Sequence, residues 1–435
     1  MRKRRSSDQE RRPEGLTPSK PEGRRAVRFE ILRDPVWNNI RVDDLTLELV
    51  DTEVFQRLRY VRQLGWTYLV YPGATHSRFE HALGTHHLSR RTLALLCEAE
   101  DSTSIGEIDQ AIVRSAALLH DVGHYPFSHA LEEIGALHHE DVARPLITEG
   151  SVAMLLSSRL GSDAPLKVFD LIRGRSDSPL QGLISGSLDL DKIEYLKRDA
   201  FMCGVPYGEI DVDRLTNSLV LVDDPETNRR SLGVQEKALS ALESLLFAKY
   251  QMYRNVYWHH AVRSATAMYK RLVEDAVRAD VVGVESLARY TDEGLMHRLE
   301  SERPTPLLSA LKERRLYKRA VEWPAADLDD GLEWIATDRK RVADIESSLA
   351  SKFGLAPGEL LLDYPVKTEM LGLDIPVLRR SGAVERLTGE GWTGTINLPT
   401  LSEELYKSAR WLRVFTAKRV TLDSSRVREV LERSR

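Results

Sequence analysis

The sequence predicts a mainly α-helical protein, a helical bundle with a small α/β appendage at its C-terminal end. Apolar residues recur at helical spacing through most of the chain, whereas short β-prone runs separated by Gly and Pro gather in its last quarter. The chain has 435 residues, of which 42% are hydrophobic and 29% charged, which suits a globular protein of two or three units. We expect a tail (1–28), a helical domain (29–324) and the appendage (325–435).

The tail is basic and poor in apolar residues. Residues 1–28 hold ten Lys or Arg and four acidic residues, a net charge of +6, although the whole chain carries −4. Such a segment buries too little surface to offset its ordering entropy, so we expect disorder. It is either a solvated leader, which we favour, or an arm that seeks phosphate groups on a nucleic acid or another anionic partner. The acidic remainder argues against a protein that coats nucleic acid.

Helical patterns follow in order along the next 300 residues. The first covers 51–64, a break follows at 65–77, and Ser77 is a candidate N-cap for a second helix over 78–100. A third helix over 108–123 stops at Gly123. Further amphipathic stretches cover about 140–160, 163–173, 189–202, 235–280, 284–300 and 306–320.

The C-terminal part changes character. The runs ELLLDYPVKTEM (359–370), IPVLRRSG (375–382) and WTGTINLP (392–399) favour strands, and WLRVFTAKRV (411–420) could pair with them. Only two cysteines occur, Cys97 and Cys203, at no zinc-binding spacing, so a disulfide framework is not expected. Because there is neither a secretion signal nor an apolar run of about 18 residues, we expect a cytoplasmic protein without membrane contact.

Histidine is concentrated in one window. Nine of the twelve histidines fall within residues 76–139. Neutral imidazole is the commonest metal ligand and titrates near neutral pH, so this window predicts a metal or acid–base site.

The central pair is His120 and Asp121, which follow the apolar helix in SAALLHDVGHYPFSH (115–129). Such a pair alone is more often a helix cap than a pair of ligands. His81, however, lies 39 residues earlier on the preceding helix and can meet His120 in an antiparallel pair, and Asp191 follows in SGSLDLDKIEYLKRD (185–199). Two imidazoles and two carboxylates suit Fe, Mn, Co or Zn with positions left open for water and a phosphate oxygen.

Two further sets accompany these ligands. Arg78 lies one helical turn before His81, where its guanidinium could grip a phosphate oxygen. In the helix from Asp189, three side chains follow one another at intervals of four residues: a possible metal ligand (Asp191), an aromatic ring (Tyr195) and a hydrogen-bond acceptor (Asp199). A cation, Lys192, lies beside the first of them. This arrangement suits a nucleotide.

Six ordered motifs across residues 30–320 resemble the HD-domain metal-dependent phosphohydrolases, whose ligand pattern is H…HD…D. Within that superfamily they are similar to the deoxynucleoside triphosphate triphosphohydrolase branch, which includes enzymes that join a sterile-alpha-motif to the HD domain. The motifs are DTEVFQRLRYVRQLG (51–65), YPGATHSRFEHALG (71–84), LLHDVGHYPFSHALE (118–132), HHE (138–140), DLDKIEYLKRD (189–199) and MYRNVYWHHAVR (252–263). The C-terminal tail resembles the appendage of bacterial members.

The resemblance implies roles for individual residues. His81, His120, Asp121 and Asp191 would hold a divalent metal (Mn, Fe, Mg, Co or Zn), and His124, His129 and His139 match non-ligand active-site histidines, of which we favour His129 as general acid. Arg78 and Lys192 would hold the phosphates, Tyr195 and Asp199 the sugar, and Tyr257 the space beside C2′. Gln63 and Leu64 match positions near the sugar and base.

The implied reaction cleaves a deoxynucleoside triphosphate (dNTP) between the 5′-oxygen and the α-phosphorus. One alternative is an HD-type phosphodiesterase or nuclease that acts on cyclic nucleotides or single-stranded DNA, and another is a nucleotide-binding regulator. By the same resemblance we expect a homo-oligomer, a tetramer in related enzymes.

An activating guanine nucleotide, dGTP or GTP, is a further expectation. Asp51, Gln56 and Arg59 match base-reading and phosphate-reading positions of family members that are activated in this way. Arg33, however, stands where those members carry Asn. The FQRLR segment could also be a packed helix.

Overall fold

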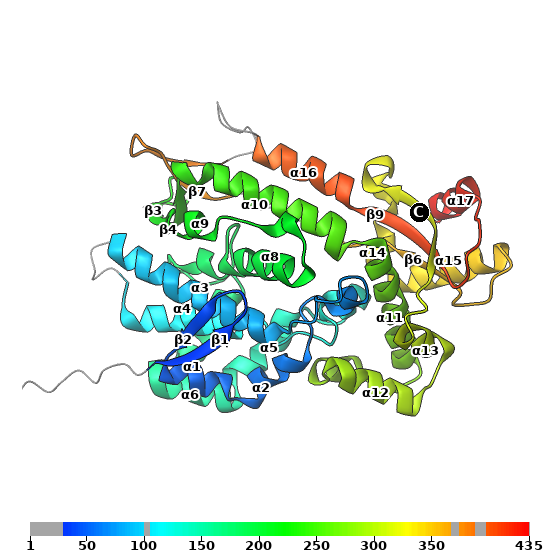
Figure 1. The fold of residues 1–435 in the computed structure, drawn as a ribbon, viewed down its shortest axis with the longest axis horizontal. Helices are drawn as coiled ribbons and strands as arrows, with labels where there is room; N and C mark the ends of the chain where they lie inside the picture. Colours follow the sequence, from blue (N-terminus) through cyan, green and yellow to red (C-terminus); the bar gives the residue numbers. More distant parts are fainter. Residues whose placement is uncertain (1–28, 100–104, 367–373, 388–396, 435) are drawn as a thin grey trace, which may run out of the picture.

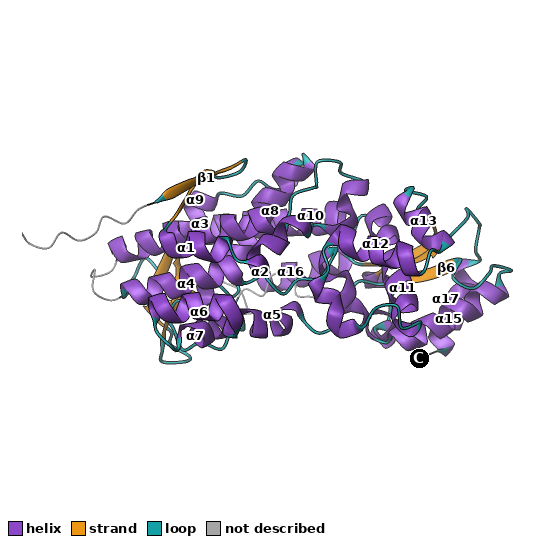
Figure 2. Cartoon of the chain, turned by 90° about the horizontal axis from the view of Figure 1, so that it is seen from below, coloured by secondary structure: helices purple, strands orange, loops and turns teal. Residues whose placement is uncertain are grey.

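The computed structural model describes residues 29–99, 105–366, 374–387 and 397–434, and helices dominate it, as predicted (Figure 1, Figure 2). The predicted tail, 1–28, lies outside the described residues. Within the described ranges, no helix is both long enough and apolar enough to cross a bilayer.

An antiparallel hairpin opens the described chain. It consists of β1 (Glu30–Asp34) and β2 (Asn38–Val42), followed by α1 (Asp44–Val50), α2 (Glu53–Gln56) and the 3₁₀ turns η1 (Arg57–Tyr60) and η2 (Gly65–Leu69). The single helix predicted over 51–64 is therefore wrong beyond Tyr60. Arg78 N donates to Val61 O at 2.9 Å and Gln63 N to His76 O at 3.0 Å, so the backbone of 61–63 is paired with 76–78 and cannot continue a helix.

Three helices form the centre of the N-terminal part. They are α3 (Arg78–Ala99), α4 (Glu107–Leu119) and α8 (Leu190–Cys203), and α3 packs against both of the others. Gly84 permits the close approach of α3 to α8, because a Cβ there would lie 1.9 Å from Glu194 Oε1. Around this core lie η3 (Ser128–Ile134), α5 (His139–Thr148), α6 (Gly150–Leu160) and α7 (Ala164–Ile172).

The long amphipathic stretch predicted over 235–280 is interrupted. It contains α10 (Leu239–Met252), one π-helical turn, η7 (Tyr253–Tyr257), and α11 (His260–Arg278). The stretch over 140–160 is likewise broken at Gly150, whose φ is +64°. Farther on come η8 (Val284–Arg289), α12 (Asp292–Glu302) and α13 (Pro306–Lys312).

Two small sheets contain strands from the last quarter of the chain. The first has the order β3-β4-β7-β8, with β3 (Leu219–Asp223), β4 (Arg230–Gln235), β7 (Pro376–Leu378) and β8 (Val384–Arg386); its β4–β7 pairing is parallel. The second has the order β5-β9-β6 and is antiparallel, with β5 (Lys318–Pro324), β6 (Leu360–Asp363) and β9 (Trp411–Thr416). The predicted pairing of 411–420 with upstream runs is confirmed for 411–416.

The expected helix over 306–320 is wrong after Lys312, because residues 318–324 form strand β5. Of the predicted strand run 392–399, residues 392–396 lie outside the described chain and α16 (Leu398–Ala409) begins at its end. The remaining helices are α9 (Val212–Thr216), α14 (Trp334–Thr337), α15 (Arg339–Lys352) and α17 (Ser424–Arg433).

Candidate active site

Four side chains from three elements meet in the interior. His81 lies on α3, His120 caps α4, Asp121 follows it, and Asp191 lies in the first turn of α8. His81 Nε2 is 3.2 Å from His120 Nε2, 2.9 Å from Asp191 Oδ1 and 3.7 Å from Asp121 Oδ2. The structure therefore brings together all four residues that the sequence predicted as ligands.

The outer nitrogens of both imidazoles are occupied. His81 Nδ1 lies 2.6 Å from Glu194 Oε2, and His120 Nδ1 lies 3.0 Å from the carbonyl oxygen of Ala117. Both Nδ1 atoms meet acceptors and donate to them, so the two Nε2 atoms face each other at 3.2 Å in the centre of the cluster. Deprotonated, they would offer two lone pairs to one cation, and the donor set suits a divalent transition metal.

The charges around this cluster favour a cation. Burial opposes a charge on His81, but hydrogen bonds to Asp191 and Glu194 outweigh it and raise its pKa to about 10. Burial also opposes the charge of Asp121, yet Arg78 and the neighbouring imidazoles hold its pKa well below the ordinary value. The site therefore keeps its carboxylates ionised and attracts positive charge.

Arg78 borders the cluster, as its position one turn before His81 predicted. Its Nη1 donates to Asp121 Oδ2 and its Nη2 to Ser128 Oγ, while its buried Nε has no partner among the described residues. Phe127 and Ser128 have φ of 57° and 70°, a left-handed backbone that costs non-glycine residues about 1–3 kcal/mol each. Asp292 Oδ1, which accepts from Phe127 N at 2.7 Å, helps to hold this turn.

Three histidines, His124, His129 and His139, gather next to Asp121 but apart from the four predicted ligands. His124 Nε2 is 3.1 Å from Asp121 Oδ1, and the ring of His124 stacks on that of His139 with centroids 3.7 Å apart. Gly123 makes this contact possible, because a Cβ there would lie 2.0 Å from the carbonyl oxygen of His139. Burial and Arg78 hold the pKa of His124 well below its ordinary value, so this ring stays neutral.

Glu132 connects two of these histidines. Its Oε1 lies 2.8 Å from His139 Nδ1 and 3.4 Å from His129 Nδ1, and His129 is the most exposed of the group, with a side chain 58% exposed. Possible metal-ligating atoms of His124, His129, Glu132 and His139 lie within 4.8 Å of one another. The stacked rings of His124 and His139 are nearly parallel, however, so their in-plane lone pairs cannot converge on one cation, and acid–base work suits this group better.

A second polar group lies two turns farther along α8. Asp199 accepts from Tyr257 Oη at 2.8 Å through Oδ2, and its Oδ1 lies 2.7 Å from His76 Nε2. The ring of Tyr195 stands edge-on to that of Tyr257, with centroids 6.4 Å apart. Three residues predicted near the sugar are thus side by side.

Lys192 directly follows Asp191 in the first turn of α8. Its Nζ donates to Asp189 Oδ2 and, at 2.9 Å, to the carbonyl oxygen of Gly186. Burial works against its charge, but Asp189 outweighs this effect and raises the Lys192 pKa, so the side chain stays a cation.

The remaining predicted residues lie on the segment before α3. Gln63 is buried, its backbone N bonds to His76 O, and its Oε1 has no partner among the described residues, while Leu64 is partly buried against the core. Asp51, Gln56 and Arg59 are not joined to the cluster by any contact between described residues; Gln56 and Arg59 bond to each other at 2.8 Å.

Several residues at the site were missed by sequence reasoning. Arg57 donates to the carbonyl oxygen of His124 at 2.7 Å, His76 holds Asp199, and Glu194 holds His81. Glu194 lies one helical turn after Asp191, a spacing that could have indicated it. For Arg57, nothing local distinguishes it from the other arginines of its segment.

Two family models match the chain. Residues 78–190 match the HD domain, and residues 210–389 match an HD-associated region.

Among similar proteins, an uncharacterized protein from Methanocaldococcus jannaschii is 33% identical over 342 residues, which is 78% of this chain and 70% of that protein. The deoxynucleoside triphosphate triphosphohydrolase SAMHD1 homolog of Dictyostelium discoideum is 27% identical, over 66% of this chain and 59% of that protein. The human deoxynucleoside triphosphate triphosphohydrolase SAMHD1 is 28% identical, over 53% of this chain and 42% of that protein. The match thus spans less than two thirds of both named enzymes.

Two solved structures superpose on most of the chain. A hypothetical protein from Aquifex aeolicus does so with a TM-score of 0.68 and 26% identity, covering 94% of this chain and 99% of that one. A phosphohydrolase from Bacteroides thetaiotaomicron gives a TM-score of 0.70 over 90% of this chain and 100% of that one, and its 22% identity shows the fold alone.

Proposed function

The chain belongs to the HD-domain phosphohydrolase family, and on that premise we propose that it hydrolyses deoxynucleoside triphosphates to a deoxynucleoside and inorganic triphosphate. The relatives from Dictyostelium discoideum and human support this substrate class, since both are deoxynucleoside triphosphate triphosphohydrolases. The alternatives are a phosphodiesterase or nuclease and a nucleotide-binding regulator.

The observation that carries the proposal is the layout of α8. This one helix presents Asp191 to the proposed metal ligands and Asp199, eight residues later, to Tyr257 and His76. Eight residues of α-helix span about 12 Å, so a nucleotide could place its α-phosphate at one group and its sugar at the other. A substrate without a sugar would leave the second group unused.

His81, His120, Asp121 and Asp191 would hold a divalent cation, which when bound polarises a phosphate oxygen and favours ionisation of a water. Arg78 and Lys192 flank this cluster and would hold negative charge on the phosphates. Their present carboxylate partners keep both side chains in place before substrate arrives.

The leaving 5′-oxygen needs a proton. His129 is exposed and faces Glu132, whereas His124 is buried beside Asp121 and Arg78. We therefore assign the general acid to His129, with His124 and His139 orienting the substrate.

Selection for deoxyribose would come from Tyr257. Its hydroxyl is fixed by Asp199, so the ring cannot move aside easily for a 2′-hydroxyl. The 2′-hydroxyl of a ribonucleotide should then clash with this ring or stay without a hydrogen-bond partner. At a buried site either effect strongly favours dNTPs over NTPs.

The test is to incubate the purified protein with Mn²⁺ and each dNTP and to separate the products. We expect deoxynucleoside and inorganic triphosphate in equal amounts, and none from Asp121→Asn. Release of pyrophosphate or orthophosphate would contradict the proposal. Cleavage of cyclic nucleotides or single-stranded DNA instead would favour the phosphodiesterase or nuclease, and binding without turnover would favour the regulator.

A further inference from the structure

A buried cluster of four charged side chains fastens η3 to the C-terminal part of the chain. Arg263 on α11 donates to both carboxylate oxygens of Glu133 on η3, at 3.0 Å each, and to both of Asp363 on β6, at 2.8 and 2.7 Å. Lys270, two turns along α11, donates to the same carboxylates at 2.7 and 3.3 Å. Arg263 and Lys270 thus each join the two carboxylates.

The planar guanidinium group of Arg263 is essential to this arrangement. It offers two edges, and each edge makes a bidentate contact with a different carboxylate, which an ammonium cannot reproduce. Arg263, Lys270 and Asp363 are each less than a tenth exposed. Burial opposes the charges of Glu133 and Asp363, but Arg263 and Lys270 outweigh it and hold both pKa values below their ordinary range.

Glu133 is the chain neighbour of Glu132. Glu132 accepts from His139 Nδ1 at 2.8 Å and lies 3.4 Å from His129 Nδ1. Successive residues of a 3₁₀ helix project about 120° apart, so one carboxylate can face the charged cluster while the next faces the histidines. Any displacement of Glu133 therefore moves the backbone that carries Glu132.

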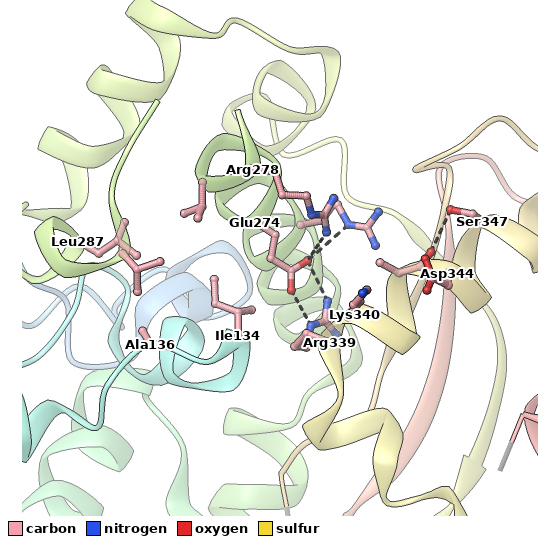
Figure 3. A pocket seen from close by; sticks show the side chains of 13 residues that line it. Ile134, Ala136, Glu274, Arg278, Leu287, Arg339, Lys340, Asp344 and Ser347 are labelled. Atoms are coloured by element: carbon pink, nitrogen blue, oxygen red, sulfur yellow. Dashed lines mark hydrogen bonds and ion pairs between the residues drawn. The ribbon is translucent and has the colours of Figure 1, made fainter. Parts of the chain in front are cut away.

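Ile134, which follows Glu133 at the C-terminal end of η3, packs against the core and also borders a cavity. Ile134 and Ala136 line a cavity of about 520 Å³ between η3, η8, α11 and α15 (Figure 3). The guanidinium groups on its far wall gather around Glu274 and do not reach η3; Arg339 Nε donates to this carboxylate at 2.7 Å (Figure 3). Core packing through Leu131 and the ion pairs of Glu133 therefore act together to hold η3 in position.

We propose that Arg263 is a positioning residue, which through Glu133 holds Glu132 against His129 and His139 and so sets the pH range of catalysis. This inference rests on the proposed function for its activity readout only. Other charged or titratable groups also face His139 and act on it in every variant tested. They are Asp121, His124, His129, His138 and Glu140.

The first experiment measures pH profiles of kcat and KM for Arg263→Lys and Glu133→Gln, with triphosphate release as the signal. If Glu132 moves away, His139 loses the carboxylate that favours its charged form, so the alkaline limb of the pH profile of kcat should move down by about half to one pH unit. At a pH on that limb kcat should fall about three- to tenfold. KM should change less than about twofold, because the cluster lies on the side of η3 away from the substrate groups.

Arg278→Lys is the matched control, because this arginine lies on the same helix but is exposed, and among the described residues its ion pairs are with Glu274 and Asp275 of α11. It should leave the profile unchanged. In a Glu132→Gln background, Glu133→Gln should add no further shift, since its effect passes through Glu132.

The second experiment needs no turnover. The pKa of His139, followed by NMR of its ring protons, should fall in Arg263→Lys and in the milder Asp363→Asn. An unchanged His139 pKa with a lowered melting temperature would overturn the proposal and leave a structural role only. A failure of the wild type to release triphosphate would contradict the proposed function. The NMR result would still decide whether Arg263 positions Glu132.

Discussion

At the scale of single residues, Glu194 and the carbonyl of Ala117 decide which ring nitrogens of His81 and His120 meet at the centre of the site. Glu194 is in turn fixed by Arg198, whose Nε donates to it at 2.8 Å, and by Trp37 Nε1 at 2.8 Å. Partners of this kind orient metal-binding imidazoles, and their loss typically costs 10–100-fold in metal affinity. The ligand geometry therefore extends well beyond the four ligands.

Asp121→Asn should abolish both bound transition metal and hydrolysis. The amide removes a negative charge that Arg78, His120 and His124 all face, while its shape is nearly unchanged. Elemental analysis should show metal in the wild type and little in the mutant, with equal helical circular dichroism. Asp109→Asn, at an exposed position of α4, is the control, and full metal occupancy of Asp121→Asn would remove Asp121 from the ligand set.

Tyr257→Ala should narrow the preference for dNTPs over NTPs. The truncation opens the space beside the sugar, so turnover of ATP should rise relative to dATP, by about tenfold or more. Tyr257→Phe keeps the ring and should keep most of the preference. Equal turnover of ATP and dATP by the wild type would contradict the whole assignment of the sugar site.

The predicted ligands could be placed from the sequence because helices are rigid. Once two helices run antiparallel, His81 and His120 must meet near one end, and the apolar faces that enforce this pairing are visible in the sequence. Glu194 and Arg57 were missed because their roles depend on partners far away in the chain, at His81 and at the His124 carbonyl. A charged residue whose partner is distant looks like any surface charge.

At the scale of elements, the π-helical turn η7 is the feature that periodicity could not reveal. The residues of 235–280 have a helical pattern on both sides of it, so the sequence predicted one uninterrupted stretch. Each residue inserted into a helix rotates the rest of that helix by about 100°, and such turns are frequent at functional sites. Here the turn ends at Tyr257, whose hydroxyl reaches Asp199.

The sheet β3-β4-β7-β8 should be sensitive to acid through the carboxylates that pair with Arg386, of which Asp224 makes the bidentate contact. Arg386 on β8 donates to both carboxylate oxygens of Asp224, at 3.1 and 2.6 Å, and this bond lowers the Asp224 pKa to about 2. Because the folded-state pKa is lowered, the stabilisation is complete above about pH 4 and is lost as pH falls toward 2.

Urea unfolding of Asp224→Asn tests this expectation. At pH 7 the free energy of unfolding should fall by about 1–3 kcal/mol, and the difference from wild type should shrink below about pH 4. Glu300→Gln, which removes an exposed pair with Lys312, should change the free energy of unfolding much less than Asp224→Asn does. A difference that is independent of pH would contradict the role of this carboxylate.

At the scale of the whole molecule, the C-terminal strands do not form one separate layer. β7 pairs with β4 of the preceding helical part and β8 pairs with β7, whereas β9 pairs with β5 and β6 pairs with β9. The sequence predicted strands in this region, but strand pairing between distant segments is set by tertiary packing, so neither the β1–β2 nor the β3–β4 hairpin was predicted. The division at residue 325 stays a prediction.

Assembly and activation remain expectations from the resemblance, and we propose that Asp51, Gln56 and Arg59 take an activating guanine nucleotide between subunits. The Arg59 guanidinium lies 3.5 Å over the ring of Phe79, the neighbour of Arg78, so a ligand at Arg59 would act close to the site. By linkage, dGTP should raise both the oligomer fraction and the turnover of a second dNTP.

Arg59→Ala should lose that activation and keep its metal. Sedimentation with and without dGTP, together with initial rates for dATP, checks both parts. Rates of dATP hydrolysis that do not respond to dGTP, in an assembly of unchanged size, would eliminate the activation and leave the catalytic proposal untouched.

The parallel pairing of β4 with β7 has a consequence for how the chain is made. β4 ends at Gln235 and its partner begins at Pro376, so the ribosome must add about 140 residues before that edge is covered. At translation rates of about 5–20 residues per second, the edge of β4 stays open for on the order of ten seconds. An open strand edge is where nascent chains associate wrongly, so chaperone supply and translation speed should limit the soluble yield of this protein.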